Sequence, residues 1–251
     1  AYPLIYLFER SFGFLSEVSL LELADTNTPL LRQLNEKAPG TFQHTIQVAN
    51  LAEEAIRVIG GDVLLVRAGA MYHDVGKMLQ PEYFIENQSG INPHNEMSPE
   101  ESAKVIINHI ASGIEIAKRH GVPDKIIDFI RTHHGTTRTE YFYRKALEDD
   151  HLVSPALYTY PGPRPFSKET AVLMMADSVE AASRSLRDVD KFRLERLIND
   201  IVAHQISLDQ FKSSNLTFKD IGDIKSVFLK KLMSIYHVRI EYPSISSARS
   251  S

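Results

Sequence analysis

The sequence predicts an all-α fold, and three observations lead to that prediction. Most segments repeat apolar residues at spacings of three and four, which is typical of amphipathic helices. Alternating runs of Val, Ile, Thr and aromatic residues long enough to build a sheet are missing. Glycines, prolines and capping residues mark several helix ends. We therefore expect the 251 residues to form a helical bundle with one long irregular loop.

The first clearly predicted helix runs from about residue 41 to residue 59. Gly60 and Gly61 follow it, and the left-handed backbone that glycine favours commonly ends a helix. An apolar helical run then leads to residues 71–77, which contain the pair His73 and Asp74. The apolar stripe of the first helix consists of Ile46, Ala49, Ala52, Ile56 and Ile59.

A second helix is predicted to begin after Ser98. The Ser98 hydroxyl is a good cap, Pro99 loses no hydrogen bond in the first turn, and two glutamates lie at the positive end of the helix dipole. This helix should continue to about residue 120, where a glycine and a proline end it. The following helix should end at the pair His133 and His134, before Gly135.

The helical pattern stops from residue 135 to residue 166, and we expect a long active-site loop there because connections of this length are usually functional or mobile. The pattern resumes near Ser167, passes through Asp177 and returns after Asp190. The serine-rich tail, residues 244–251, lacks periodicity and is predicted to be disordered.

Composition excludes several classes of protein. Hydrophobic residues make up 43% and charged residues 24%, which is ordinary for a globular protein. The formal net charge of -4 provides no broad basic surface, so a nucleic-acid polymer is not an expected partner. The absence of cysteine excludes disulfides and thiolate metal ligands. No run approaches the roughly 20 apolar residues of a spanning helix, and no signal peptide is recognisable, so we expect this stretch to be soluble.

The candidate site residues are weak evidence when each is taken alone. An isolated His-Asp pair is more often a capped helix end, and paired histidines at a helix end can act as a cationic cap. Asp177 is more telling, because it lies in an apolar run where burying a bare carboxylate is costly. The alternative is that Asp177 faces solvent beside Glu180 and Arg184, which could form a surface pair.

Taken together, the histidines and aspartates follow the pattern H…HD…H…HH…D, which resembles the two-metal branches of the HD superfamily. Further segments are similar to the cytoplasmic HD domain of the seven-transmembrane HD receptors, a bacterial family, and the likeness extends from about Tyr2 to Pro243. The segments that carry this second resemblance are residues 38–44, 84–88, 92–94, 133–137, 160–163 and 236–243.

The resemblance implies a domain organisation and a function. Residues 1–34 would be a membrane-proximal helical segment, residues 35–243 an HD phosphohydrolase domain of helical-bundle type, and residues 244–251 a tail. That family hydrolyses the second messenger cyclic di-AMP to linear pApA. Its members reach this module through membrane helices that are missing here, so the full-length protein would be tethered at the cytoplasmic face of the membrane. A homodimer is also compatible with the resemblance.

Carried over residue by residue, the resemblance implies two metal sites. One would be formed by His44, His73, Asp74 and Asp177. The other would be formed by Asp74, His109, His133 and His134, so that Asp74 bridges the two. A carboxylate has two oxygens for two cations, and this set of oxygen and nitrogen donors suits iron, manganese or zinc, with iron or manganese expected.

The expected chemistry is in-line attack of a metal-bridging water or hydroxide on phosphorus, with Asp74 and Lys77 as catalytic residues. Lys77 would neutralise a phosphate or assist the leaving oxygen, unless it is simply solvated. Arg138, Tyr141 and Arg164 are predicted to bind substrate through phosphate contacts and base stacking. The alternative is that the aromatic residues of this segment only pack the loop. Competing functions are an HD-type nucleotidase or dNTP phosphohydrolase and a catalytically silent nucleotide sensor.

Overall fold

A computed structural model describes residues 15–149 and 152–237. This described part contains no β-strand, only an isolated bridge between Arg138 and Thr159, so the all-α prediction is confirmed. None of its helices is long and apolar enough to cross a membrane. The elements are α2 (Glu17–Leu23), α3 (Pro29–Lys37), α4 (Pro39–Ile59), α5 (Val63–Tyr72), η1 (Val75–Leu79), η2 (Pro81–Tyr83), η3 (Ile85–Asn87), η4 (Pro93–Glu96), α6 (Pro99–Arg119), α7 (Asp124–Thr132), α8 (Glu140–Asp149), η5 (Pro155–Tyr158), α9 (Lys168–Ser183), α10 (Lys191–Ser207) and α11 (Phe218–Ile235).

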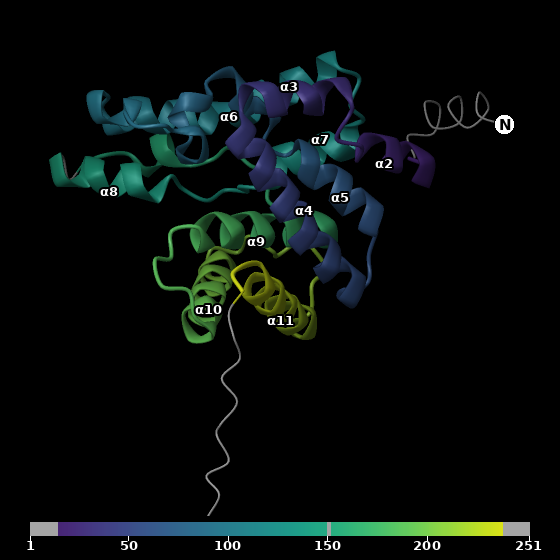
Figure 1. The fold of residues 1–251 in the computed structure, drawn as a ribbon. Helices are drawn as coiled ribbons and strands as arrows, with labels where there is room; N and C mark the ends of the chain where they lie inside the picture. Colours follow the sequence, from purple (N-terminus) through teal and green to yellow (C-terminus); the bar gives the residue numbers. More distant parts are fainter. Residues whose placement is uncertain (1–14, 150–151, 238–251) are drawn as a thin grey trace, which may run out of the picture.

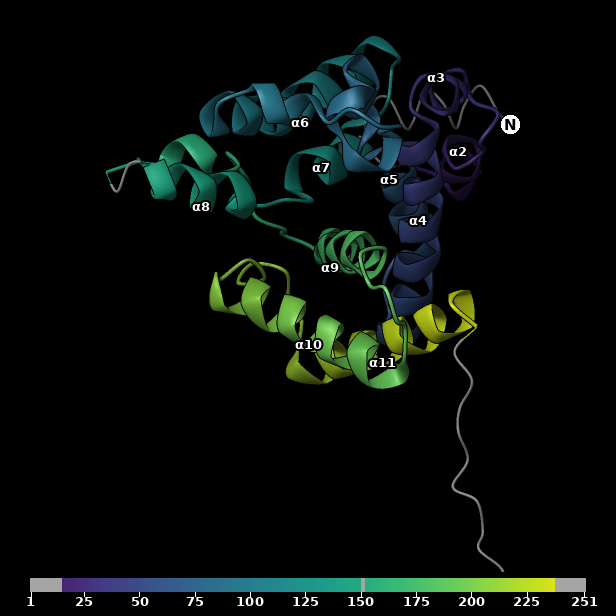
Figure 2. The ribbon, with the colours of Figure 1, turned by 60° about the vertical axis from the view of Figure 1, so that its left-hand side comes forward.

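Helix α4 connects the two ends of the bundle. Figures 1 and 2 show α3, α6 and α7 toward one end, α9, α10 and α11 toward the other, and α4 running between them. Helix α4 packs against α3, α5, α9 and α11. Because one long helix contacts so many others, side chains on different faces of α4 can meet residues that are far away in the sequence.

One continuous hydrophobic core joins both ends of the bundle. It includes Leu31 of α3, Leu51 of α4, Leu173 of α9 and Phe228 of α11, all of which are fully buried. The boundary predicted after residue 34 falls inside α3, whose apolar side chains belong to this common core. The predicted tail and the first fourteen residues lie outside the described residues.

The predicted helix signals are present in the structure. Ser98 and Glu101 form a reciprocal capping box at the start of α6, where the Ser98 hydroxyl accepts the Glu101 N–H and the Glu101 carboxylate accepts the Ser98 N–H. Gly60 follows α4 with a φ of 76°, and Gly135 follows the histidine pair with a φ of 51°. These left-handed conformations explain why glycine stands at both positions.

The segment from residue 135 to residue 166 is not irregular throughout, and this part of the sequence prediction is wrong. It contains the helix α8 and the short 3₁₀ turn η5. Arg144 donates to Glu140 one helical turn away, and Ala146 packs with Tyr158 against Ala103 of α6. This small separate core stabilises α8 although its sequence lacks a long apolar stripe.

A glycine allows the His73-Asp74 corner to approach α6 closely. A Cβ atom on Gly76 would lie 1.9 Å from the backbone oxygen of His109 and 2.7 Å from the nitrogen of Gly113. Any side chain at position 76 would therefore push η1 away from α6. The absence of one is what brings Asp74 and His109 within reach of each other.

Candidate metal centre

The structure brings all seven predicted ligands into one region. His73 ends α5 and Asp74 follows it, both nearly inaccessible to solvent. The remaining five come from α4 (His44), α6 (His109), the end of α7 (His133 and His134) and α9 (Asp177). They form two groups of side chains whose donor atoms lie within 4.8 Å of one another, which we call the first cluster (His44, His73, Asp74, Asp177) and the second cluster (His109, His133, His134).

The first cluster combines two imidazoles with two carboxylates. His44 Nε2 lies 2.9 Å from Asp177 Oδ1, and His73 Nε2 lies 3.7 Å from the same oxygen. All four side chains are almost completely buried. The Nδ1 atom of His73 donates to the backbone oxygen of Ala70, 2.7 Å away, so Nε2 is the nitrogen that points into the cluster.

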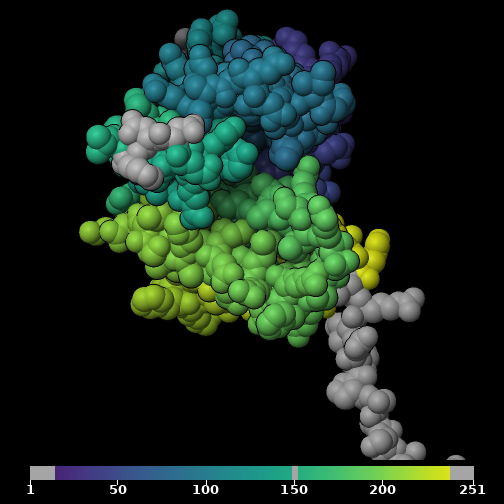
Figure 3. All heavy atoms as spheres, turned by 90° about the vertical axis from the view of Figure 1, so that its left-hand side faces the viewer, coloured from purple at the N-terminus to yellow at the C-terminus, as the bar shows by residue number. Residues whose placement is uncertain are grey.

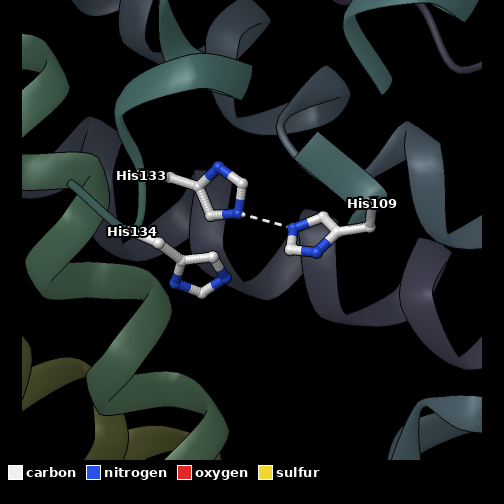
Figure 4. Close-up of side chains that lie close together, drawn as sticks. All are labelled: His109, His133 and His134. Carbon is white, nitrogen blue, oxygen red and sulfur yellow. Dashed lines mark hydrogen bonds between the residues drawn. The ribbon is translucent and has the colours of Figure 1, made fainter. Parts of the chain in front are cut away.

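The second cluster consists of imidazoles only. Figure 4 shows the rings of His109 and His133 turned toward each other with His134 beside them, and their Nε2 atoms are 3.2 Å apart. His109 Nδ1 donates to the Ile106 oxygen at 2.5 Å, and His133 Nδ1 donates to the Ile130 oxygen at 2.9 Å. Both bonds fix the tautomer that leaves Nε2 unprotonated toward the cluster.

Asp74 lies between the two clusters, and each of its oxygens faces one of them. Oδ2 lies 3.3 Å from His73 Nε2 and 3.7 Å from His44 Nε2. Oδ1 lies 3.4 Å from His109 Nε2 and 3.5 Å from His133 Nε2. A carboxylate in this position has one oxygen available for a cation on either side.

The donor atoms fit bound cations better than they fit each other. Buried His73 Nε2 and Asp74 Oδ1 have no hydrogen-bond partner, and Asp74 Oδ2 is paired with the Lys77 ammonium, 2.8 Å away. Orphaned buried polar atoms are costly, and an ion is one of the few groups that can satisfy several of them at once. The close approach of His44 Nε2 to Asp177 Oδ1 likewise requires a proton or a cation between them.

The electrostatic surroundings of the first cluster favour positive charge. Burial by itself lowers the pKa of His73, but Asp74 and Asp177 outweigh burial and raise it to about 10. Burial also opposes ionisation of Asp74, yet Lys77 and His73 hold the pKa of this carboxyl well below its usual range. Both carboxylates of the cluster are therefore ionised, because the pKa of Asp177 is similarly lowered by His44 and His73 despite its burial.

Two imidazoles of the second cluster, those of His109 and His134, stay neutral. Burial, reinforced by the field of His133, lowers the pKa of His109 to about 3 despite the opposing effect of Asp74. Burial and His133 hold the pKa of His134 well below its usual value as well. Neutral imidazoles have a lone pair to offer, which is the form that binds a metal.

Lys77 lies beside the first cluster, held by two carboxylates. Its ammonium nitrogen lies 2.8 Å from Asp74 Oδ2 and 3.0 Å from Glu86 Oε1. Burial alone would lower the pKa of Lys77, but Asp74 and Glu86 raise it above its ordinary value, so the side chain stays charged. Glu86 also accepts a hydrogen bond from the Thr41 hydroxyl at 3.0 Å, which fixes the carboxylate that holds the lysine.

A cleft of about 360 Å³ opens beside the first cluster. Figure 3 shows the surface hollowed between the blue and teal part of the molecule and the green part. Three of the predicted ligands reach this cleft, together with Lys77 and side chains from η3 and the end of α9. Its lining residues are His44, Lys77, Ile85, Glu86, His134, Asp177, Ser178, Ala181, Arg184 and Ser185.

The three predicted substrate contacts are not among the residues that line this cleft. Arg138 makes an ion pair with Glu140 and lies over the Tyr143 ring, 4.1 Å from its centroid. Tyr141 is exposed on α8, and Arg164 donates to the Thr136 hydroxyl at 3.0 Å. The contacts of both arginines therefore lie within the segment between α7 and α9.

Sequence reasoning missed two side chains that support the clusters. Glu180 is buried and accepts a hydrogen bond from His44 Nδ1. Tyr160 stacks on His134, with ring centroids 4.2 Å apart and an interplanar angle of 23°. Glu180 carried a usable signal, since it lies three residues after Asp177 and hence on the same side of the helix.

Comparison with known proteins identifies the chain as similar to a group of phosphodiesterases. Residues 41–182 match the HD domain family model. Two proteins named cyclic-di-AMP phosphodiesterase PgpH are similar along the sequence. The one from Bacillus subtilis is 43% identical over 96% of this chain and 34% of its own length. The one from Listeria monocytogenes is 45% identical over 95% of this chain and 33% of its own length.

The solved HD domain of the Listeria monocytogenes phosphodiesterase PgpH, in complex with cyclic-di-AMP, has the same fold. It is 43% identical, with a TM-score of 0.82, and the match covers 84% of this chain and all of that domain. The chain spans about a third of the length of the curated relatives it matches.

Proposed function

The chain belongs to the HD-domain family, and from that membership we propose that it is a metal-dependent phosphodiesterase that hydrolyses cyclic di-AMP to linear pApA. The observation that carries this proposal is the position of Asp74, with one oxygen toward each cluster. The names of the similar proteins support the choice of substrate. Asp74 is proposed as the bridge, with the first and second clusters as the remaining ligands of two divalent ions.

Iron or manganese is the proposed metal, because the donors are imidazole nitrogens and carboxylate oxygens and include no thiolate. When bound, a pair of such ions activates a water at neutral pH and stabilises charge on phosphoryl oxygens. The chain's own contribution is to hold the ligands in buried, fixed geometry and to exclude bulk water from them.

Lys77 is proposed to stabilise the negative charge that develops on the substrate. Its ammonium lies next to Asp74 and lines the cleft, so a phosphodiester there meets a positive charge fixed between two carboxylates. A preorganised cation in a buried site acts more strongly than one in water, because nothing must reorient during the reaction. Glu86 is proposed to keep the ammonium in place.

The cleft suits a nucleotide in both size and chemistry. Its volume falls within the range of about 300–1,000 Å³ that is usual for small-molecule sites. Ile85 and Ala181 give it apolar surface for a base, while Arg184 and the Ser178 and Ser185 hydroxyls give it polar groups for phosphate and ribose. Arg138, Tyr141 and Arg164 remain predicted contacts for the part of the substrate that extends beyond this cleft.

The full-length protein is proposed to be tethered to the membrane, with this domain at the cytoplasmic face. The support is the resemblance of the sequence to the cytoplasmic HD domain of the seven-transmembrane HD receptors. The homodimer remains a prediction.

Metal analysis combined with product analysis tests the proposed function. The purified chain, loaded with Mn²⁺, is incubated separately with cyclic di-AMP, cyclic di-GMP and a dNTP, and the products are resolved by chromatography. We expect two metal ions per chain and conversion of cyclic di-AMP to pApA faster than any other reaction. Release of triphosphate from the dNTP would instead identify a nucleotide triphosphohydrolase. Tight binding of cyclic di-AMP without turnover would identify a sensor.

A further inference from the structure

Glu180 is a buried carboxylate that the predicted ligand set does not include. It lies on α9 and exposes only 5% of its surface. A carboxylate buried to this degree is strongly unfavourable unless both oxygens find partners. In this chain both oxygens do, and the two partners are His44 and Arg184.

One oxygen of Glu180 is bound by a ligand and the other by an arginine. Oε2 accepts a hydrogen bond from His44 Nδ1. Oε1 accepts from Arg184 Nε at 2.7 Å and pairs with Arg184 Nη2 at 2.6 Å. Arg184 follows Glu180 by one helical turn, and its side chain lines the cleft. The guanidinium therefore fixes the carboxylate, and the carboxylate fixes the imidazole ring.

This contact determines which nitrogen His44 presents to the first cluster. With Nδ1–H donated to Glu180, the nitrogen that faces the first cluster is Nε2, which lies 2.9 Å from Asp177 Oδ1 and can bind an ion once it has given up its proton. A carboxylate behind a histidine also makes the imidazole a stronger donor toward a metal. Ring orientation and donor strength thus depend on the same residue.

His44 differs in this respect from the other buried histidines of the clusters. His73, His109 and His133 each donate Nδ1–H to a neutral backbone oxygen of their own helix, namely that of Ala70, Ile106 and Ile130. Those contacts are local and survive most side-chain substitutions. The Nδ1–H of His44 is instead bound by a charged side chain on α9, a helix far away in the sequence, so a single substitution can remove this contact.

We propose that Glu180 is a positioning residue for the metal ion of the first cluster, that Arg184 holds it in place, and that the second cluster does not depend on either. The inference rests on the proposed two-metal function. Loss of an outer-shell partner of a metal-binding histidine typically lowers metal affinity by about 10- to 100-fold. The affected ion should be the one near His44, and the ion near His109 should be retained.

Titration of metal-free protein with Mn²⁺ followed by calorimetry tests the proposal in the wild type and in E180Q. Glutamine keeps the shape of the side chain and an acceptor for His44 but removes the charge. We expect two sites in the wild type, and in E180Q one site weakened by about 10- to 100-fold and one unchanged. Glu53→Gln is the matched control, because Glu53, like Glu180, is a helical glutamate whose carboxylate is paired through both oxygens, but its partners are two arginines, Arg57 and Arg67, and not a histidine.

A second variant, R184Q, leaves the Glu180–His44 contact in place and removes only the ion pair between Arg184 and Glu180. A smaller loss at the same single site is expected, and this variant decides the question if E180Q does not fold. If both sites keep their affinity in both variants, the inference about Glu180 is overturned but the proposed function is not. The same holds if both sites are weakened equally and the melting temperature falls. Wild-type protein without Mn²⁺ sites would instead overturn the proposed function, and the inference with it.

Discussion

The two clusters of the candidate metal centre are built from different charges. The first contains the carboxylates of Asp74 and Asp177, with Lys77 beside it. The second contains three imidazoles, and the carboxylate that reaches it within 3.5 Å is the shared Asp74. Asp74 and Asp177 raise the pKa of His73 despite its burial, whereas burial lowers the pKa of His109 despite Asp74, so two histidines of the same centre differ in charge.

This difference predicts that the proposed ions are not held equally. An ion in the first cluster would keep one full negative charge, that of Asp177, if Asp74 were neutralised. An ion in the second cluster would keep none. Neutral nitrogen donors bind transition metals well but do not compensate the charge of a divalent cation in a buried site. The second cluster should therefore be the more sensitive of the two to changes in Asp74.

The largest effect is expected for Asp74→Asn. The second cluster should lose its ion and the first should bind more weakly, so metal content should fall to one ion per chain or less. Turnover of cyclic di-AMP should fall by more than the roughly 100-fold typical of outer-shell substitutions. Elemental analysis and a turnover assay on the same sample measure both. Asp200→Asn on the surface is the control. Two ions bound as in the wild type would refute the bridging role, and retained activity with the metal lost would refute the metal-dependent mechanism.

An intermediate effect is expected for His134→Ala, which removes one member of the second cluster and also a 4.0 Å contact with Asp177 of the first. His134 is the most exposed member of that cluster, with a quarter of its side chain accessible, so its removal should disturb the core little. One of two ions should be lost, and turnover should fall by about 100-fold or more because both ions are needed. Exposed His204→Ala is the control. Loss of the first-cluster ion as well would show that the clusters are not separable.

Much of the fold was predictable because its signals are local. Ser98 and Glu101 cap α6 within four residues of sequence, and Gly60 ends α4 through its own backbone conformation. Helix α8 is not predicted because its stability depends on tertiary contacts, in which Ala146 packs with Tyr158 against Ala103 of another helix. Short-range patterns do not report such a contact.

The candidate site likewise has a part that the sequence pattern predicts and a part that depends on tertiary packing. The pattern of histidines and aspartates predicted which side chains meet, and the structure places them within a few ångströms of one another. Glu180 and Arg184 were considered only as a surface pair, since their spacing fits one. They do pair, but Glu180 is buried, because α9 is covered on several sides by other helices. Spacing along one helix does not reveal what packs over it.

The smallest effect is expected for Tyr160→Leu, and it tests whether the second cluster is supported as firmly as the first. Tyr160 stacks on His134, and burial raises its pKa, so the phenol stays neutral and contributes packing without charge. An aromatic pair of this kind contributes about 0.5–1.5 kcal/mol, which corresponds to at most roughly a tenfold change in affinity.

Calorimetric titration with Mn²⁺ should therefore show the second site weakened by less than about tenfold in the Tyr160→Leu variant, with the first site unchanged. Tyr160→Phe keeps the ring and should bind both ions as the wild type does. The loss of Mn²⁺ affinity at the second site in Tyr160→Leu can be compared with the loss at the first site in E180Q. The comparison is informative, because a charged hydrogen bond supports His44 whereas a neutral ring supports His134. A loss at the second site as large as that of E180Q at the first would mean that packing alone can position a ligand as strongly as a carboxylate.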